Sequence, residues 1–242
     1  MSNDSIVIVN GARTPMGSFQ GSLKDVSATE LGAAAIKAAV ERSGISADKV
    51  DEVIMGCILT AGLGQGPARQ AMRKAGLPDS TGAVTINKLC GSGLKAVMQA
   101  FDGIRAGSFN VAVAGGMESM TNAPYIMPGA RGGYRMGHKE VKDHMFLDGL
   151  EDAETGKLMG QFAQEMANDK GYSREQMDDF AIESLNRALT AIKEGHFDNE
   201  ITPVTFETRK GEQTVDTDEE PGLSNAERIP TLRPAFAKDG TI

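Results

Sequence analysis

The stretch Asn87-Lys88-Leu89-Cys90-Gly91-Ser92-Gly93-Leu94 decides how the fold of this chain is interpreted. It places one cysteine between an apolar run typical of a strand (residues 83–86) and a run with helical spacing (residues 94–104). Unpaired N–H groups and the positive end of the helix dipole at such a junction stabilise a thiolate, which can lower the pKa of a cysteine below its free value of about 8.5. Cys90 is therefore a candidate nucleophile. The alternative is a buried structural thiol, since cysteine is among the most buried residue types.

Strand-like and helix-like runs alternate on both sides of this stretch. A capping box at Ser27-Ala28-Thr29-Glu30 opens a helix that ends at Gly44. The predicted order is strand 6–9, buried on both faces, then that helix, strand 53–55, helix 67–74, strand 83–87, helix 90–105 and strand 111–114. Such alternation predicts an α/β fold, with βαβ units on a parallel central sheet. Ligands usually bind at the carboxyl ends of such strands, where Cys90 lies.

The overall charge argues against nucleic acid as a partner. The chain has 242 residues, enough for one large domain or two modest ones. It has 33 acidic and 25 basic side chains, which give a net charge of −8. Binding to the phosphates of nucleic acid without sequence specificity requires an excess of basic side chains instead. An anionic ligand must then be met by a local basic patch.

The cysteines and the N-terminus indicate a cytoplasmic protein. Cys57 and Cys90 make no disulfide framework, and no metal-ligand spacing joins them to the three histidines. The start Met1-Ser2-Asn3-Asp4-Ser5 lacks a basic and apolar leader, and no run of about 18 apolar residues occurs. We therefore expect no membrane partner.

A change of composition after Ser119 predicts a boundary between residues 1–119 and residues 120–242. The second part begins with a basic, weakly periodic loop (residues 121–142) that is solvated by default or holds a phosphate or another subunit's acids. Two helices follow, one over residues 157–170 and one opened by a second capping box at Ser173-Arg174-Glu175-Gln176, and then a β-hairpin (residues 204–206 and 214–215). The acidic run of residues 216–220 is interpreted as a solvated loop.

Other motifs leave alternatives open. The glycines of residues 62–66 lie between a strand and a helix, as in a nucleotide-binding turn, but their spacing is not G-x-G-x-x-G. His138 and His144 are candidate bases for Cys90, which would make the protein a cysteine-dependent thioester hydrolase. Loop histidines are more often solvated.

Taken together, the motifs resemble those of the thiolase family, with its acetyl-CoA acetyltransferase members the nearest likeness. Five segments carry the resemblance in order: Asn10-Gly11-Ala12-Arg13-Thr14-Pro15 with Gly17-Ser18-Phe19-Gln20-Gly21, Gly64-Gln65-Gly66-Pro67-Ala68-Arg69-Gln70, Asn87-Lys88-Leu89-Cys90-Gly91-Ser92-Gly93, Gly115-Gly116-Met117-Glu118-Ser119-Met120, and Leu232-Arg233-Pro234-Ala235-Phe236 with Asp239-Gly240-Thr241. The likeness covers the whole chain. It implies a thiolase-like first βαβ domain (residues 1–119), its parallel sheet lacking the final strand, and an inserted α+β loop domain over coenzyme A (residues 120–242).

The resemblance implies that Cys90 carries the acyl group. In thiolases the thiolate attacks an acyl-CoA, and a second acyl-CoA then attacks the acyl-cysteine in a Claisen condensation; the reverse is thiolysis of a 3-ketoacyl-CoA, as in fatty acid metabolism. Coenzyme A and acyl-CoA are then substrates, with no permanently bound cofactor. The backbone N–H of Cys90 at a helix start suits an oxyanion hole.

By position in the family, Leu150 and Met159 line the pantetheine arm and Phe236 lies beside the nucleotide end. Leu158 departs from the pattern, because many biosynthetic members have histidine there. An arginine that many members place near the adenine is also missing around Pro221-Gly222. These departures concern the acyl preference and the coenzyme A contacts.

The largest departure from the thiolase pattern concerns the end of the chain. In thiolases a second half supplies an activating histidine, a water-positioning asparagine and a second catalytic cysteine, and no Gly-His-Pro or third cysteine occurs here. We therefore expect a fragment of a longer enzyme, with a catalytically silent CoA-binding or assembly module as the alternative. The resemblance also implies a homodimer or homotetramer.

Overall fold

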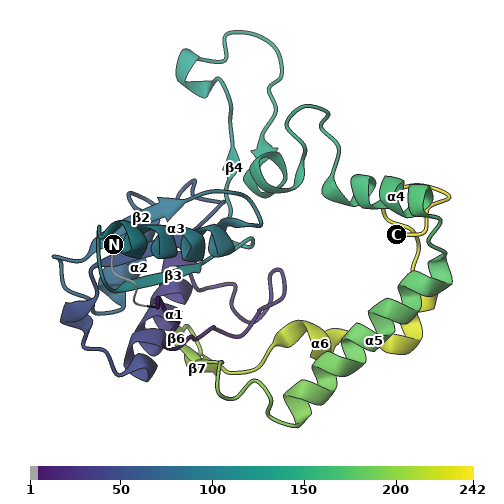
Figure 1. Cartoon of the computed structure of the whole chain (residues 1–242). Coiled ribbons are helices and arrows are strands. Elements are labelled where there is room, and N and C mark those ends of the chain that lie inside the picture. Colours follow the sequence, from purple (N-terminus) through teal and green to yellow (C-terminus); the bar gives the residue numbers. More distant parts are fainter. Residues whose placement is uncertain (1–4) are drawn as a thin grey trace.

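The core is a three-stranded parallel sheet in the order β2-β1-β3, seen in the computed structural model of residues 5–242 (Figure 1). Its strands are β1 (Glu52–Gly56), β2 (Gly82–Ile86) and β3 (Ala112–Gly116). β1 pairs in register with both neighbours, so that Gly56 lies opposite Ile86 on one side and Gly116 on the other. The carboxyl ends of the three strands therefore meet at one edge. The N-terminal stretch Met1–Asp4 lies outside the described residues.

Helices cover both faces of this sheet. Because successive side chains of a strand point to opposite faces, Val53 and Met55 pack under α1 (Ala28–Ser43) and α2 (Pro67–Lys74), while Ile54 packs under α3 (Ser92–Ala106). The result is a helix–sheet–helix sandwich. The α/β class and the parallel sheet predicted from the alternation are confirmed.

The first helix begins and ends where the local signals place it. The Ser27 Oγ accepts the N–H of Glu30 at 3.3 Å, and the Glu30 carboxylate accepts the N–H of Ser27 at 2.9 Å. Gly44 ends the helix with φ +71°, a left-handed conformation that glycine adopts without steric cost. The predicted capping box is therefore present.

The predicted strand over residues 6–9 is wrong. Residues 5–12 form no strand, and the side chains of Val7, Ile8 and Val9 are exposed, Ile8 by 84%. An apolar β-branched run favours extended backbone but becomes a strand only beside a partner. Within residues 5–242, the three-stranded sheet pairs with no part of this segment.

The rest of the chain leaves the sandwich and then returns to it. A short hairpin of β4 (Tyr125–Ile126) and β5 (Lys142–Asp143) projects from the core, and the arm that follows carries α4 (Met159–Lys170) and α5 (Arg174–Lys193) (Figure 1). The hairpin of β6 (Val204–Thr208) and β7 (Gly211–Val215) then packs on α1 and on the turn before it, in a cluster that joins Val204 to Leu23, Val26, Leu31 and Ala34. The remaining short elements are η1 (Ala47–Lys49), η2 (Ala130–Gly132), η3 (Phe146–Leu150), α6 (Glu219–Leu223) and η4 (Ala226–Thr231).

The division of the chain at residue 119 stays a prediction.

None of the helices in residues 5–242 combines the length and the apolar character needed to cross a membrane.

Candidate active site

Cys90 lies in the turn that joins β2 to α3, and its side chain is exposed. The helix begins at Ser92, two residues later than predicted, so Cys90 lies just outside its first turn. The N–H of Gly91 donates to the carbonyl of Lys88 at 3.1 Å, and the N–H of Ser92 donates to that of Leu89 at 2.9 Å. The thiol is thus presented to solvent at the N-terminal end of a 15-residue helix.

A glycine at the end of β1 lets this helix start close to the sheet. A β-carbon on Gly56 would lie 2.5 Å from the Ser92 Cβ and 3.0 Å from the Gly93 nitrogen. Because real β-carbons do not come as close as the first of these distances, a larger residue at position 56 would lift α3 away from the strand ends. A β-carbon on Gly116 would lie 3.6 Å from the Gly93 Cα, which is an ordinary contact distance. Gly56 therefore holds the cysteine turn at the carboxyl edge of the sheet.

The backbone N–H of Cys90 is free to bind a ligand. Within residues 5–242 it donates to no protein acceptor, whereas the following two N–H groups are used inside the turn. An N–H at a helix N-terminus favours a negatively charged oxygen. The thiol and a donor for the oxyanion of a thioester intermediate therefore belong to one residue.

The second cysteine has a different environment. Cys57 is buried directly after β1, and its Sγ lies 3.5 Å from the Oε1 of Glu118. Burial, followed by the nearby negative charge of Glu118, raises the pKa of the Cys57 thiol to about 12. Cys57 is therefore protonated at neutral pH and is a poor nucleophile.

Glu118 is a structural anchor that the sequence analysis missed. Its carboxylate accepts the N–H of Ile58 at 2.9 Å and that of Leu59 at 3.0 Å. It thereby ties the loop after β1 to the segment after β3, beside the cysteine turn. An acidic residue two positions after the glycines that end an apolar strand was the available signal.

Neither of the two candidate bases, His138 and His144, is hydrogen-bonded to Cys90. His144 is buried, contrary to the expectation of a solvated loop histidine: its Nε2 accepts the N–H of Ala61 at 3.3 Å, and its Nδ1 lies 2.6 Å from the Oδ2 of Asp148. His138 is exposed in the loop between β4 and β5. Within residues 5–242, no histidine hydrogen-bonds to Cys90. The hydrolase interpretation finds no support in this geometry.

The three residues expected to contact coenzyme A gather around the start of α4. Leu150 ends η3, and the residue after it pairs with Leu158, directly before Met159. The ring of Phe236 packs against Gly160, the residue after Met159. Figure 1 shows α4 and the C-terminal end on an arm of the molecule, apart from α3 and β2. The structure therefore brings these three residues to one place but gives them no contact with Cys90.

The family model for the thiolase N-terminal domain matches residues 6–242. The chain belongs to the thiolase family. It is 51% identical over 239 residues to an acetyl-CoA acetyltransferase of Pseudomonas aeruginosa, covering 98% of this chain and 61% of that relative. An acetyl-CoA acetyltransferase of Cupriavidus necator is 49% identical, with the same shares covered.

The fold likeness is equally broad. A crystal structure of the Acat5 thiolase from Ascaris suum in complex with coenzyme A superposes with a TM-score of 0.89 at 39% identity, over 97% of this chain and 59% of that one. The chain thus spans about three fifths of the length of the thiolases it matches. This confirms the family resemblance and the thiolase-like fold.

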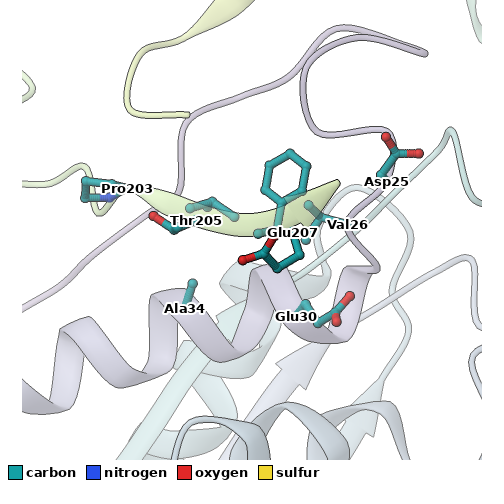
Figure 2. A pocket seen from close by; sticks show the side chains of 9 residues that line it. Asp25, Val26, Glu30, Ala34, Pro203, Thr205 and Glu207 are labelled. Carbon is teal, nitrogen blue, oxygen red and sulfur yellow. The ribbon is translucent and has the colours of Figure 1, made fainter. Parts of the chain in front are cut away.

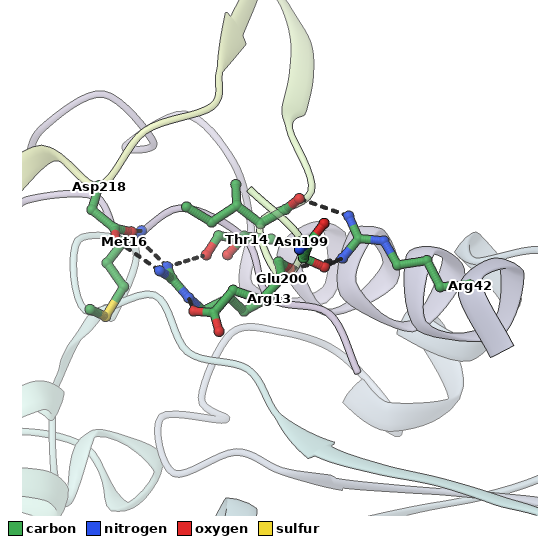
Figure 3. Close-up of polar contacts among 8 residues, drawn as sticks. Arg13, Thr14, Met16, Arg42, Asn199, Glu200 and Asp218 are labelled. Carbon is green, nitrogen blue, oxygen red and sulfur yellow. Dashed lines mark hydrogen bonds and ion pairs between the residues drawn. The ribbon is translucent and has the colours of Figure 1, made fainter. Parts of the chain in front are cut away.

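In this thiolase chain the acidic run is solvated only in part: Asp216, Thr217 and Glu220 are exposed, but the prediction is wrong for Asp218. Asp218 is buried and accepts hydrogen bonds from Arg13 and from the N–H of Met16 (Figure 3). The Arg13 guanidinium holds the pKa of the Asp218 carboxyl below its usual range. Sequence could not show this, because the partner lies at the other end of the chain. A long-range ion pair thus joins the N-terminal loop to α6.

A pocket also lies away from the cysteine turn, between α1 and β6 (Figure 2). It has a volume of about 480 Å³, and its walls carry the carboxylates of Asp25, Glu30 and Glu207. These charges repel the phosphates of coenzyme A. We therefore assign no part of the thiolase site to it.

Proposed function

We propose that this chain carries the acyl-accepting half of a thiolase that acts on acetyl-CoA, with Cys90 as the nucleophile. The observation that carries the proposal is an exposed thiol at a strand–helix turn whose own backbone N–H is free. The Cys90 sulfur attacks the thioester carbonyl, the C–S bond to coenzyme A breaks, and CoA leaves as a thiol with the proton given up by Cys90. The free N–H faces the oxyanion formed on the way.

Condensation completes the proposed reaction. A base of the thiolase removes an α-proton from a second acetyl-CoA, the enolate attacks the acyl-cysteine carbonyl, and a C–C bond forms as the Cys90 thiolate leaves to give acetoacetyl-CoA. The α-proton then returns to the Cys90 thiolate. Thiolysis of a 3-ketoacyl-CoA, a step of fatty acid breakdown, is the reverse. Coenzyme A and acyl-CoA are substrates here, with Leu150, Met159 and Phe236 lining the arm that holds them; the gathering of these residues at α4 supports this assignment.

Incubation with acetyl-CoA followed by peptide mass spectrometry tests the proposal. We expect an acetyl group on the peptide that contains Cys90, release of an equal amount of coenzyme A, and loss of both in Cys90→Ser. Acetylation at another residue, with Cys90 unmodified, would contradict it. Formation of acetoacetyl-CoA, measured separately, shows whether the second half-reaction follows.

A catalytically silent CoA-binding or assembly module is the second candidate. It is favoured by the absence, within residues 5–242, of any histidine hydrogen-bonded to Cys90. Calorimetric binding of coenzyme A without acetylation of Cys90 would favour it over the first.

We also propose a homodimer or homotetramer in the cytoplasm. The assembly rests on family likeness, and light scattering at several protein concentrations tests it. The compartment rests on the two cysteines, which are both free thiols and suit a reducing environment. Fractionation of cells that express a tagged protein tests the location.

A further inference from the structure

The turn that presents Cys90 contains an unfavourable backbone conformation. Leu89 has φ +48°, in the left-handed region that residues with a β-carbon rarely adopt. Its side chain is 53% exposed and belongs to none of the buried apolar clusters of residues 5–242, so packing in the core does not hold the conformation in place. Other groups must therefore stabilise the turn.

Ser92 supplies two hydrogen bonds that close the turn around Cys90. Its Oγ accepts the N–H of Lys88 at 2.8 Å and donates to the carbonyl of Leu89 at 2.6 Å. One hydroxyl thus bonds to both of the residues that precede Cys90. Asn87 adds a single bond from the exposed side, its Oδ1 accepting the N–H of Leu89 at 2.9 Å.

The hydroxyl is itself held firmly by the fold. Ser92 is buried at the first position of α3, and its Cβ packs against the backbone of Gly56 at the end of β1. Packing against the sheet therefore fixes the position of the Ser92 hydroxyl. The hydroxyl in turn fixes the conformation of the exposed turn through its hydrogen bonds.

We propose that Ser92 is the positioning residue of the nucleophile, because its hydroxyl keeps Leu89 left-handed and so keeps Cys90 at the N-terminal end of α3. This rests on the proposed role of Cys90. Without the hydroxyl, Leu89 relaxes to negative φ and the thiol leaves the end of the helix, where the helix dipole favours a negatively charged sulfur.

The test compares alkylation of Cys90 in four variants of the full chain: Ser92→Ala, Leu89→Gly, the double variant, and Ser43→Ala. Iodoacetamide forms an S–C bond to the thiolate as iodide leaves, and peptide mass spectrometry follows Cys90 and Cys57 separately. Glycine at position 89 adopts positive φ without steric cost. Leu89→Gly should therefore keep the left-handed conformation even when the Ser92 hydroxyl is removed. Ser43 is a matched control, because its Oγ also donates to a carbonyl (Val40, 2.7 Å) and accepts an N–H (Ile45, 3.0 Å) at the end of α1.

We expect Ser92→Ala to slow alkylation of Cys90 about fivefold, the effect of one typical net hydrogen bond. The double variant should recover most of that rate, and Ser43→Ala should match the unmodified chain. Cys57 should stay slow in all of them, since it reports loosening of the sandwich.

An unchanged Cys90 rate in Ser92→Ala would overturn the proposal. So would a slower rate that Leu89→Gly does not recover, or a parallel rise at Cys57, because each indicates a purely structural role. If Ser92→Ala does not fold, the double variant decides: a folded double variant with a Cys90 rate near that of the unmodified chain supports the proposal, and a double variant that also fails to fold refutes it. Alkylation uses no acyl-CoA, so its outcome is independent of the acetylation test.

Discussion

Asp218 binds both terminal nitrogens of Arg13, although 205 residues separate the two in sequence. The Nη1–Oδ1 distance is 2.7 Å and the Nη2–Oδ2 distance is 2.9 Å, a bidentate pair of the kind that planar guanidinium groups favour (Figure 3). The neighbouring Glu219 accepts the N–H groups of Ser18 and Ser22 at 2.8 and 2.9 Å. The start of α6 is thereby attached to the loop that carries the first family motif.

We predict that Asp218→Asn lowers the free energy of unfolding by about 1–3 kcal/mol, because it removes the buried one of the two carboxylates that pair with the Arg13 guanidinium and leaves only the more exposed Glu200. Urea unfolding followed by circular dichroism measures this. Glu183→Gln is the control, since the Glu183–Arg187 pair is 58% and 78% exposed and should change stability by less than about 0.5 kcal/mol. Equal effects of the two substitutions would contradict the prediction.

The same acidic residues predict a loss of stability in acid. The pKa of Asp218 is lowered from 3.8 by its hydrogen bond from Arg13, and that of Glu219 from 4.5 by the N–H groups of Ser18 and Ser22. A carboxyl whose folded pKa is lowered stabilises the fold above its unfolded pKa, and this stabilisation is lost as the pH falls through the folded pKa. We expect the double variant Asp218→Asn, Glu219→Gln to lose less stability between about pH 5 and pH 2 than the unmodified chain does. If urea unfolding shows that the variant and the unmodified chain lose the same free energy of unfolding over that pH range, the prediction is contradicted.

Glu118 is predicted to raise the pKa of Cys57 through its negative charge. In a Cys90→Ser background, Glu118→Gln should lower the pKa of Cys57 from its value of about 12, because the neutral amide no longer disfavours the thiolate. The pKa should stay above that of a free thiol, since burial is the larger cause. Titration of the thiolate absorbance measures it, and an unchanged or higher pKa in the variant would show that the charge has no effect.

Gly160 is predicted to be essential for the position of Phe236. A methyl group at residue 160 would overlap the Phe236 ring, so Gly160→Ala should displace the C-terminal segment and destabilise it by about 1–3 kcal/mol. Limited trypsin digestion should then cleave faster after Lys238. Gly222→Ala is the matched control, because a methyl group there meets no atom within 4 Å. Equal cleavage of the two variants would count against the contact.

Local signals were sufficient for most elements of the fold. The capping boxes at Ser27 and Ser173 are both present, helix α2 occupies the predicted residues, and the strands of the parallel sheet begin and end within two residues of their predicted positions. These features depend on residues close together in sequence, such as a serine three positions before a glutamate or glutamine, or a proline in the first turn of a helix.

Features that depend on distant partners were not predictable. Val7, Ile8 and Val9 have the composition of a buried strand but no strand beside them. Asp218 and His144 were expected in solvent, yet both are buried, because Arg13 and the N–H of Ala61 provide partners for their polar atoms. A polar side chain is buried only where the fold brings it a hydrogen-bond partner, and that pairing is invisible in a local pattern.

Sequence by itself determined the order of strands and helices, the position of Cys90 at the junction of a strand and a helix, and the family to which the motifs belong. Tertiary structure decided that α3 begins at Ser92, that Leu89 is left-handed, and that the Ser92 hydroxyl lies where it closes the turn. The reason is packing: Gly56 at the end of β1 lets α3 approach the strand ends, and that approach places the Ser92 hydroxyl beside the backbone that precedes the thiol.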